Sequence, residues 1–218
     1  MHTVEEAIRS RRATRAYSEQ PITDEVLDKV VALTLEAPSA FNAQRADLVI
    51  VRDQDVKDAI FEASGQAQLR DAPVVLITVA RADIPEDLEE ILGQKRADFV
   101  RGYLGKLDQA ALRETAMKDA MLLAGFALIA AQGEGLATSP TTGWNEAKVL
   151  EAIGLGGRED RGVGLVIGMG YPAESPAHPG RAASRRVENR YYRSSSVGMA
   201  SPQNTSSTTW RARRVSLK

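Results

Sequence analysis

Four arginines near the N-terminus form the densest group of side chains that could bind a charged ligand: Arg9, Arg11, Arg12 and Arg15. They lie at the end of a segment with helical spacing, so they could simply be solvated cations at the negative end of a helix dipole. However, the segment runs directly into Ala16, so the side chains could also converge on one point. Guanidinium groups form charge-assisted, forked hydrogen bonds with phosphates and with carbonyl oxygens that gain negative charge.

Two loops carry short polar side chains that could contact a flat, polar ligand. The first, residues 37–44, offers Ser39, Asn42 and Gln44 after a helix, although such side chains can equally satisfy the backbone of a turn. The second has the sequence Ser-Pro-Thr-Thr-Gly-Trp, in which Gly143 allows a close approach of the backbone. Each loop therefore has both a functional and a purely structural interpretation.

The composition excludes several kinds of active site. The chain has no cysteine, which removes disulfides, thiolate zinc sites, iron–sulfur clusters and cysteine nucleophiles. Its only histidines are His2 and His178, so a three-histidine zinc site and HExxH chemistry are also excluded, and we expect no metal site. The reactive group of an enzyme with this sequence would be a carboxylate, a hydroxyl, a lysine or a cofactor.

A glycine-rich segment, Gly162-Val-Gly-Leu-Val-Ile-Gly168, invites comparison with a dinucleotide-binding fingerprint. Its spacing is GxGxxxG instead of GxGxxG, and Tyr171-Pro172 follows it where a helix would be needed. A phosphate-binding turn of that kind requires a strand, a tight turn and then a helix N-terminus. We therefore interpret the segment as a strand.

Capping signals and hydrophobic periodicity predict the elements that position these loops. One helix is expected to begin at Val4, and further helices are expected over residues 24–36, 55–63, 110–132 and 146–153. Broken helix is expected over residues 85–107. The expected strands cover residues 48–51, 73–79, 136–138 and 162–170.

The longest expected helix is apolar on every side in its second half, residues 120–131. A helix without a polar face must be buried all round, either in a core or between subunits. This apolar run is too short to span a bilayer, and acidic residues near the N-terminus stand where a signal peptide needs an apolar core. We therefore expect a cytoplasmic protein without a membrane partner.

Length and charge indicate one domain with a distinct tail. The chain has 218 residues, of which 43% are hydrophobic, as in a soluble globular domain. Residues 181–218 contain nine basic side chains and one acid, whereas residues 1–180 contain 19 basic and 28 acidic ones. Such a tail could fold onto the acidic body or onto a twin subunit, or bind a polyanion. We expect a domain over residues 1–193 and a disordered, Ser/Thr-rich tail over residues 194–218.

Together the loops resemble one family, the FMN-dependent nitroreductases, and most closely its small quinone- and nitro-reducing members. The matching segments span about residues 3–190: Ser10-Arg-Arg-Ala-Thr-Arg-Ala-Tyr17, Ala37-Pro-Ser-Ala-Phe-Asn-Ala-Gln44, Pro140-Thr-Thr-Gly143, Ile167-Gly-Met-Gly-Tyr-Pro172 and Arg181. The resemblance implies an α+β fold with a mostly antiparallel central sheet wrapped by helices. It also implies an intertwined homodimer with two FMN sites at the interface.

The resemblance further implies roles for residues near the two chain ends. Arg11 and Arg181 resemble the arginines that bind the FMN phosphate. Arg12 and Ala13 are similar to positions that line the ribityl chain and the edge of the ring. Arg15 resembles the cation beside the pyrimidine end of the flavin, where it would favour the reduced, anionic form.

The polar loops would complete the flavin site. Ser39, Asn42 and Gln44 resemble the loop that is contributed across the dimer interface. Pro140 begins the other loop, in which the backbones of Thr142 and Gly143 resemble those that face flavin N5; with Arg15, these two are the predicted catalytic residues. Either Gln66 or Gln68 falls where many members place a side chain near the pyrimidine ring.

Three positions depart from the family pattern. Ala13 stands where a serine is frequent, which removes one hydroxyl group. Arg45-Ala46 follows the first loop where Pro-Trp is common, so we expect an altered apolar lid. After Arg181 the chain lacks the usual proline-containing segment, and Arg185 is a rival for the phosphate role.

The activity that the resemblance implies is hydride transfer from NADH or NADPH, through FMN, to a small acceptor such as a nitroaromatic or a quinone. Donor and acceptor would use one pocket in turn, in a ping-pong mechanism. Alternatives are a flavin-binding sensor or storage protein without turnover, and another flavin reaction on the same fold, such as dehalogenation, semialdehyde reduction or an oxidase reaction. A nucleic-acid adaptor is not expected, because no recognition-helix pattern accompanies the basic tail.

Overall fold

The computed structural model describes residues 3–182 and 185–187, and the predicted tail of residues 194–218 lies outside the described residues. The chain divides into two compact units, residues 1–178 and 179–218. The helices and strands below all belong to the first unit. The predicted domain boundary at residue 193 stays a prediction.

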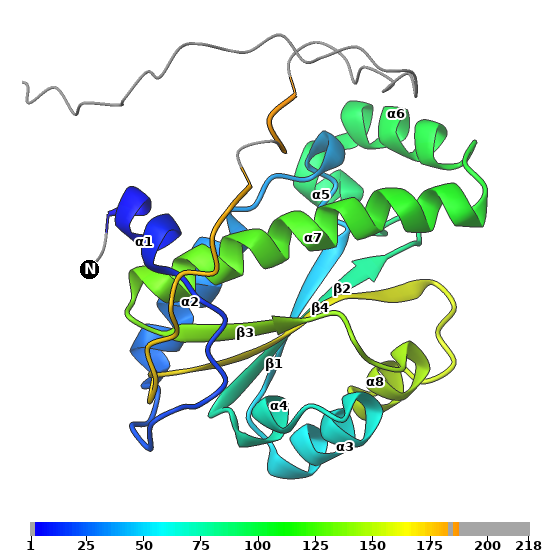
Figure 1. The fold of residues 1–218 in the computed structure, drawn as a ribbon. Coiled ribbons are helices and arrows are strands. Elements are labelled where there is room, and N and C mark those ends of the chain that lie inside the picture. The colour runs from blue at the N-terminus through cyan, green and yellow to red at the C-terminus, as the bar shows by residue number, and fades with distance from the viewer. Residues whose placement is uncertain (1–2, 183–184, 188–218) are drawn as a thin grey trace, which may run out of the picture. The chain divides into compact units, whose positions relative to one another are not determined.

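A four-stranded antiparallel sheet lies at the centre of the first unit (Figure 1). Its strands are β1 (Ala46–Val51), β2 (Val74–Arg81), β3 (Ala137–Thr141) and β4 (Arg161–Gly170), in the order β1-β2-β4-β3. Val49 pairs with Ile77, which in turn pairs with Val166. The central strands β2 and β4 are buried over nearly their whole length, as their continuous apolar sequences predict.

Helices cover both faces of this sheet, because successive side chains of a strand point to opposite faces (Figure 1). Leu76 and Ile167 pack with α2 (Asp24–Leu35) and α7 (Gln109–Gly133). Ile77 and Val166 pack on the other side with α3 (Gln54–Ser64), α4 (Ala67–Asp71) and α8 (Glu146–Ala152). The predicted α+β fold, a mostly antiparallel sheet wrapped by helices, is confirmed.

The predicted helix caps are present. Thr3 and Glu6 form a reciprocal capping box at the start of α1 (Val4–Ser10), and the side chains of Thr23 and Asn145 cap α2 and α8. The expected broken helix is observed as α5 (Leu88–Leu92) and α6 (Gln94–Leu104).

Two short elements and several strand boundaries differ from expectation. Sequence reasoning missed α4 and the 3-10 turn η1 (Ala40–Asn42). The strand expected over residues 136–138 continues to Thr141, so Pro140 lies in β3 and not in the loop. Proline is tolerated there because β3 is an edge strand.

The glycines of β4 serve packing. A Cβ atom on Gly164 would lie 2.6 Å from the Oγ1 atom of Thr78, and one on Gly168 would lie 2.8 Å from the hydroxyl oxygen of Tyr17. Each glycine therefore makes room for a side chain against the strand. This confirms the interpretation of the segment as a strand.

The long helix α7 is buried on one side only. Its alanines, among them Ala120, Ala124 and Ala127, pack on the sheet. Its opposite side leaves large apolar side chains 40 to 47% exposed: Met121, Leu122 and Phe126. Burial all round within the chain's own core is therefore wrong for this helix. By length and composition α7 is the one helix among the described residues that could cross a membrane, but it packs as a core helix of the sheet.

Candidate functional site

The segment that follows α1 lies along β3 and beside the chain that leaves β4. The backbone N–H of Thr14 donates to the carbonyl oxygen of Thr138 at 3.0 Å, and Ala13 forms a parallel bridge with Thr138. Tyr17 forms an antiparallel bridge with Pro172. The N-terminal arginines are thus fixed against the strand that leads into the second polar loop.

The structure gives the four arginines different surroundings. Arg12 donates from Nη1 to the carbonyl oxygens of Arg9 and Arg11, at 2.7 and 2.8 Å, so it caps the end of α1. Arg9 forms an ion pair within α1. Arg11 is half-buried, whereas Arg15 is exposed and its backbone N–H donates to Oε1 of Glu174 at 2.6 Å. The helix-end interpretation therefore fits Arg9 and Arg12, and the predicted ligand-binding roles of Arg11, Arg12 and Arg15 stay predictions.

Gln66 is the centre of a hydrogen-bond network that reaches residues 140–143, which are the last two residues of β3 and the two that follow it and are called the 140–143 loop below. Its Nε2 donates to Oγ1 of Thr141 and, at 2.9 Å, to the carbonyl oxygen of Gly143. Its Oε1 accepts from Nε2 of Gln68 at 2.7 Å. A Cβ atom on Gly143 would lie 3.3 Å from Nε2 of Gln66, so glycine leaves room for this approach. Gln66 is therefore brought to the predicted loop, and Gln68 is linked to it through Gln66.

Thr141 is a member of this site that sequence reasoning missed. Its hydroxyl accepts from Gln66 and, at 3.3 Å, from the backbone N–H of Gly143. Thr142, the predicted residue, is exposed and follows the end of β3. Successive side chains of a strand point to opposite faces. A predicted strand that continued through Pro140 would therefore have placed Thr141 and Thr142 on opposite faces and distinguished their roles.

The first polar loop, residues 39–44 and called the 39–44 loop below, is compact and has unusual backbone angles. Phe41, Asn42 and Gln44 have φ values of 60°, 56° and 49°, and they are the non-glycine residues with positive φ in the described chain. Such left-handed conformations are unfavourable for side chains with a Cβ and often mark ligand-binding segments. The hydroxyl of Ser39 accepts from the backbone N–H of Gln44 at 3.0 Å and closes the loop.

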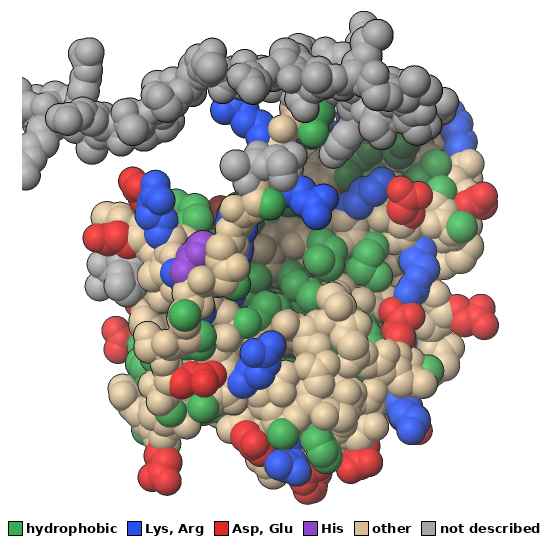
Figure 2. Space-filling model, viewed as in Figure 1, with side chains coloured by type: hydrophobic (Ala, Val, Ile, Leu, Met, Phe, Trp, Pro, Cys, Tyr) green, Lys and Arg blue, Asp and Glu red, His purple; other side chains and the backbone are tan. Residues whose placement is uncertain are grey.

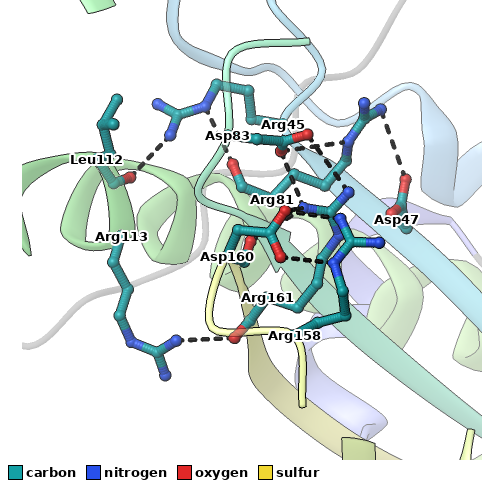
Figure 3. A network of polar contacts seen from close by, with 9 residues as sticks. All are labelled: Arg45, Asp47, Arg81, Asp83, Leu112, Arg113, Arg158, Asp160 and Arg161. Carbon is teal, nitrogen blue, oxygen red and sulfur yellow. Dashed lines mark hydrogen bonds and ion pairs between the residues drawn. The ribbon is translucent and has the colours of Figure 1, made fainter. Parts of the chain in front are cut away.

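Arg45, which follows this loop, is fully buried between β2 and α7 (Figure 3). Its Nε donates to the carbonyl oxygen of Arg81 at 3.1 Å, its Nη1 to Oγ1 of Thr115 at 2.9 Å, and its Nη2 to the carbonyl oxygen of Leu112 at 2.8 Å. Burial lowers the pKa of Arg45, and the nearby carboxylate of Asp119 opposes that change. The sequence predicts an altered apolar lid at this position. The structure has a buried arginine there, whose hydrogen bonds anchor it inside the protein.

Asp119 reaches the same loop from α7. Its side chain is 5% exposed, and its Oδ1 accepts from the backbone N–H of Ala40 at 3.1 Å. Its Oδ2 is buried without a hydrogen-bond partner among the described residues. Burial raises the pKa of the Asp119 carboxyl, against the opposing effects of the Ala40 N–H and Arg45.

A second charged network, also in Figure 3, lies where β4 begins. Asp160 accepts from Arg158 and Arg161, and Arg161 also pairs with Asp83 at 3.0 Å. The hydrogen bond from Arg158 lowers the pKa of Asp160 to about 2. All these charges are paired with one another, so the network is interpreted as structural.

Three aromatic side chains meet beside the 39–44 loop. The ring of Phe41 lies 5.2 Å from that of Tyr103 and 6.1 Å from that of Phe99, both in edge-to-face geometry. All three are exposed. They form an aromatic surface next to the polar side chains of the loop.

Arg181 and its rival Arg185, the C-terminal candidates for the phosphate role, lie in the second unit. Arg181 donates from Nη1 to the carbonyl oxygen of Gly180 at 2.6 Å, and the backbone N–H of Arg185 donates to the carbonyl oxygen of Ala182 at 3.1 Å. The choice between them stays a prediction. Among the described residues, no group of three or more His, Asp and Glu side chains could hold a metal ion.

The fold and these loops define an α+β protein with a candidate ligand site built from an arginine-bearing N-terminal segment and the end of an edge strand. Residues 8–171 match the Nitroreductase family, and the chain belongs to that family. It is 31% identical to an NADH dehydrogenase of Thermus thermophilus over 180 residues, which cover 77% of this chain and 87% of the relative. It is 28% identical to an FMN reductase [NAD(P)H] of Bacillus subtilis over 87% of this chain and 74% of the relative.

The solved structures agree on the fold. One is a protein of Exiguobacterium sibiricum, assigned as a nitroreductase and solved in complex with FMN. It superposes with a TM-score of 0.77 over 85% of this chain and 95% of its own, at 17% identity.

Proposed function

We propose that this protein is an FMN-dependent oxidoreductase that takes reducing equivalents from NADH or NADPH and passes them to a small electron acceptor. Family membership and the relatives that are an NADH dehydrogenase and an FMN reductase support the cofactor and the donor. Bound FMN would supply the hydride-transfer chemistry, and the protein would supply placement and charge.

The groups that the fold gathers suit a flavin mononucleotide. Arg11 and Arg15 provide cations for a phosphate and for the anionic edge of a flavin. The amides of Gln66 and Gln68, at the start of α4, form a network with the backbone of Gly143, and a flat heterocycle needs donors and acceptors of this kind. The Oγ1 atom of Thr138, next to the arginine-bearing segment, is buried without a hydrogen-bond partner among the described residues and could take one from a ligand.

The observation that carries the proposal is this meeting of the N-terminal segment with β3. The hydrogen bond from Thr14 to Thr138 and the network of Gln66 bring residues that are far apart in sequence to neighbouring places. Arg15 would stabilise negative charge that develops on the flavin during reduction, because a fixed cation costs no reorganisation at that step. Thr142 and Gly143 would present their backbone to the reacting edge.

A homodimer would complete this site. An apolar groove of about 800 Å³ runs along α7, and it is lined by Ala110, Arg113, Glu114, Met117, Lys118, Met121 and Leu122. Figure 2 shows a hollow with hydrophobic side chains on the face where α7 crosses the sheet. A second copy that covered this face would bury the exposed side of α7 and bring its own Ser39, Asn42 and Gln44 to the flavin. We also propose a cytoplasmic location.

The acceptor would be planar. The exposed rings of Phe41, Phe99 and Tyr103 stand beside the 39–44 loop, and aromatic surfaces favour flat, conjugated partners. Nitroaromatics and quinones fit this description, and donor and acceptor would alternate in one pocket. A sensor or storage protein would bind the same flavin without turnover.

The test is steady-state oxidation of NADH or NADPH by the FMN-loaded protein with a small quinone. We expect turnover, and we expect Arg15→Ala to slow flavin reduction about tenfold to a hundredfold, because a charge-assisted hydrogen bond contributes about 1.5–3 kcal/mol. Arg9→Ala is the matched control from the same cluster and should leave the rate unchanged. A loaded protein that oxidises neither nicotinamide with any acceptor would be a flavin-binding protein without turnover.

A further inference from the structure

We propose that Asp119 and Arg45 are positioning residues that hold the 39–44 loop in the conformation in which it meets FMN. The inference rests on the proposed function, which assigns this loop to the flavin site. Neither residue belongs to the predicted flavin-binding set, and both are buried. They would act on the cofactor only through the backbone of the loop.

The conformation of the loop requires support from outside. Phe41, Asn42 and Gln44 all have left-handed backbone angles, which are unfavourable for residues with a Cβ atom. The bonds inside the loop close it on itself: Ser39 accepts from Gln44, and the backbone N–H of Ala43 donates to Ala40 at 3.0 Å. These bonds do not fasten the loop to the rest of the protein.

Asp119 provides one fastening and Arg45 the other. The Oδ1 atom of Asp119 holds the N–H of Ala40 at the start of η1, and so ties that turn to α7. Arg45 directly follows Gln44, the last residue of the loop. Its guanidinium donates hydrogen bonds to Leu112 and Thr115 of α7 and to Arg81 of β2. The two ends of the loop are therefore held on the same helix.

Burial of the Asp119 carboxylate and the Arg45 guanidinium costs desolvation free energy that an apolar interior would not cost. A buried carboxylate with one unpartnered oxygen and a buried guanidinium both lose hydration, and an apolar pair of similar volume is often at least as stable. A polar pair at such a place is therefore better explained by what it positions than by the stability it adds.

The other side of the loop is held by packing. Ala43 is fully buried among Leu88, Ala97 and Val100 of α5 and α6, and Phe41 contacts Tyr103 of α6. The loop thus connects α6 with α7. Loss of the Asp119 bond would leave the packing side intact and free the end that carries Ser39.

The experiment is a titration of apoprotein with FMN, followed by the quenching of flavin fluorescence. We expect Asp119→Ala to raise the dissociation constant of FMN about tenfold or more. Asp119→Asn should stay within about threefold of wild type, because its side-chain oxygen still accepts from Ala40. If Asp119→Ala does not fold, Asp119→Leu removes the acceptor without leaving a cavity and takes its place. Unchanged affinity in the Ala or Leu variant, or an equal loss in Asp119→Asn, would overturn the role of this acceptor.

Two further measurements separate positioning from other failures. Val51→Ala truncates a buried side chain at the far end of β1 and should leave FMN affinity unchanged; a loss equal to that of Asp119→Ala would show only general destabilisation. Hydrogen exchange of the Ala40 amide should accelerate in Asp119→Ala, whether or not FMN is present. Accelerated exchange in a protein that never binds FMN would refute the proposed function and leave the anchoring by Asp119 standing, whereas unchanged exchange would refute the anchoring itself.

Discussion

The two polar loops of the candidate site are held in place by different chemistry. The 140–143 loop is fastened by uncharged groups, since Gln66 donates to Thr141 and Gly143. The 39–44 loop is fastened by a buried carboxylate and a buried guanidinium, those of Asp119 and Arg45. Within the described chain, left-handed non-glycine residues lie in the 39–44 loop and not in the 140–143 loop.

The difference follows from how each loop leaves its element. The 140–143 loop begins with the last two residues of β3, so the strand already fixes its direction and one amide side chain is enough to hold it. The 39–44 loop joins α2 to β1 through a strained turn, and its hydrogen bonds inside the loop do not fix its place. We infer that the support of the 140–143 loop makes no pH-dependent contribution to the stability of the fold, whereas Asp119, which supports the 39–44 loop, makes one.

The largest effect in this comparison is expected at Gln66. Gln66→Ala removes two hydrogen bonds to the 140–143 loop, each of which contributes about 0.5–1.5 kcal/mol, so kcat/KM for the nicotinamide should fall about fivefold to 150-fold. Gln68→Ala loses only its bond to Gln66 and should show a smaller loss. Stopped-flow measurement of flavin reduction checks both. Equal rates in Gln66→Ala and wild type would mean that the loop holds its position without the amide.

A smaller effect should distinguish the loops by pH. Burial raises the pKa of Asp119 above its unfolded value of 3.8, so the folded state keeps this proton longer than the unfolded state does. The contribution of Asp119 to stability is therefore present below pH 3.8 and is lost as pH rises through the folded pKa. Asp119→Asn should accordingly gain unfolding free energy relative to wild type over that window, and the gain should level off above it.

Denaturant unfolding at a series of pH values measures this difference. The matching difference for Gln66→Ala should not change over the same pH range, because an amide does not titrate there. A pH-independent difference for Asp119→Asn, or one that falls as pH rises, would contradict the assignment of a raised pKa to this carboxyl.

Much of the framework could be predicted from local signals. The starts of three helices are predicted by their N-cap residues, Thr3, Thr23 and Asn145. The apolar segments of β2 and β4 predict buried strands. These features depend on neighbours in sequence, which is why a single chain is enough to recognise them.

The supports of the two loops could not be predicted in the same way. Phe41 and Asn42 have left-handed backbone angles although neither is a glycine, so the local sequence does not indicate this conformation. The contacts that hold the loop come from α7 and α6, which lie far away in the sequence. Asp119 does lie three residues after the buried Ala116, so helical spacing could have placed it on the inner face of α7. Nothing in the local sequence indicates that Arg45 would be buried, since its hydrogen-bond partners are far along the chain.

The most direct test of the central claim is to purify the protein, measure its molar mass in solution and determine the FMN bound per chain. The account predicts a yellow dimer that releases FMN when heated and carries one flavin for each chain. A colourless monomer that takes up no added FMN would contradict it.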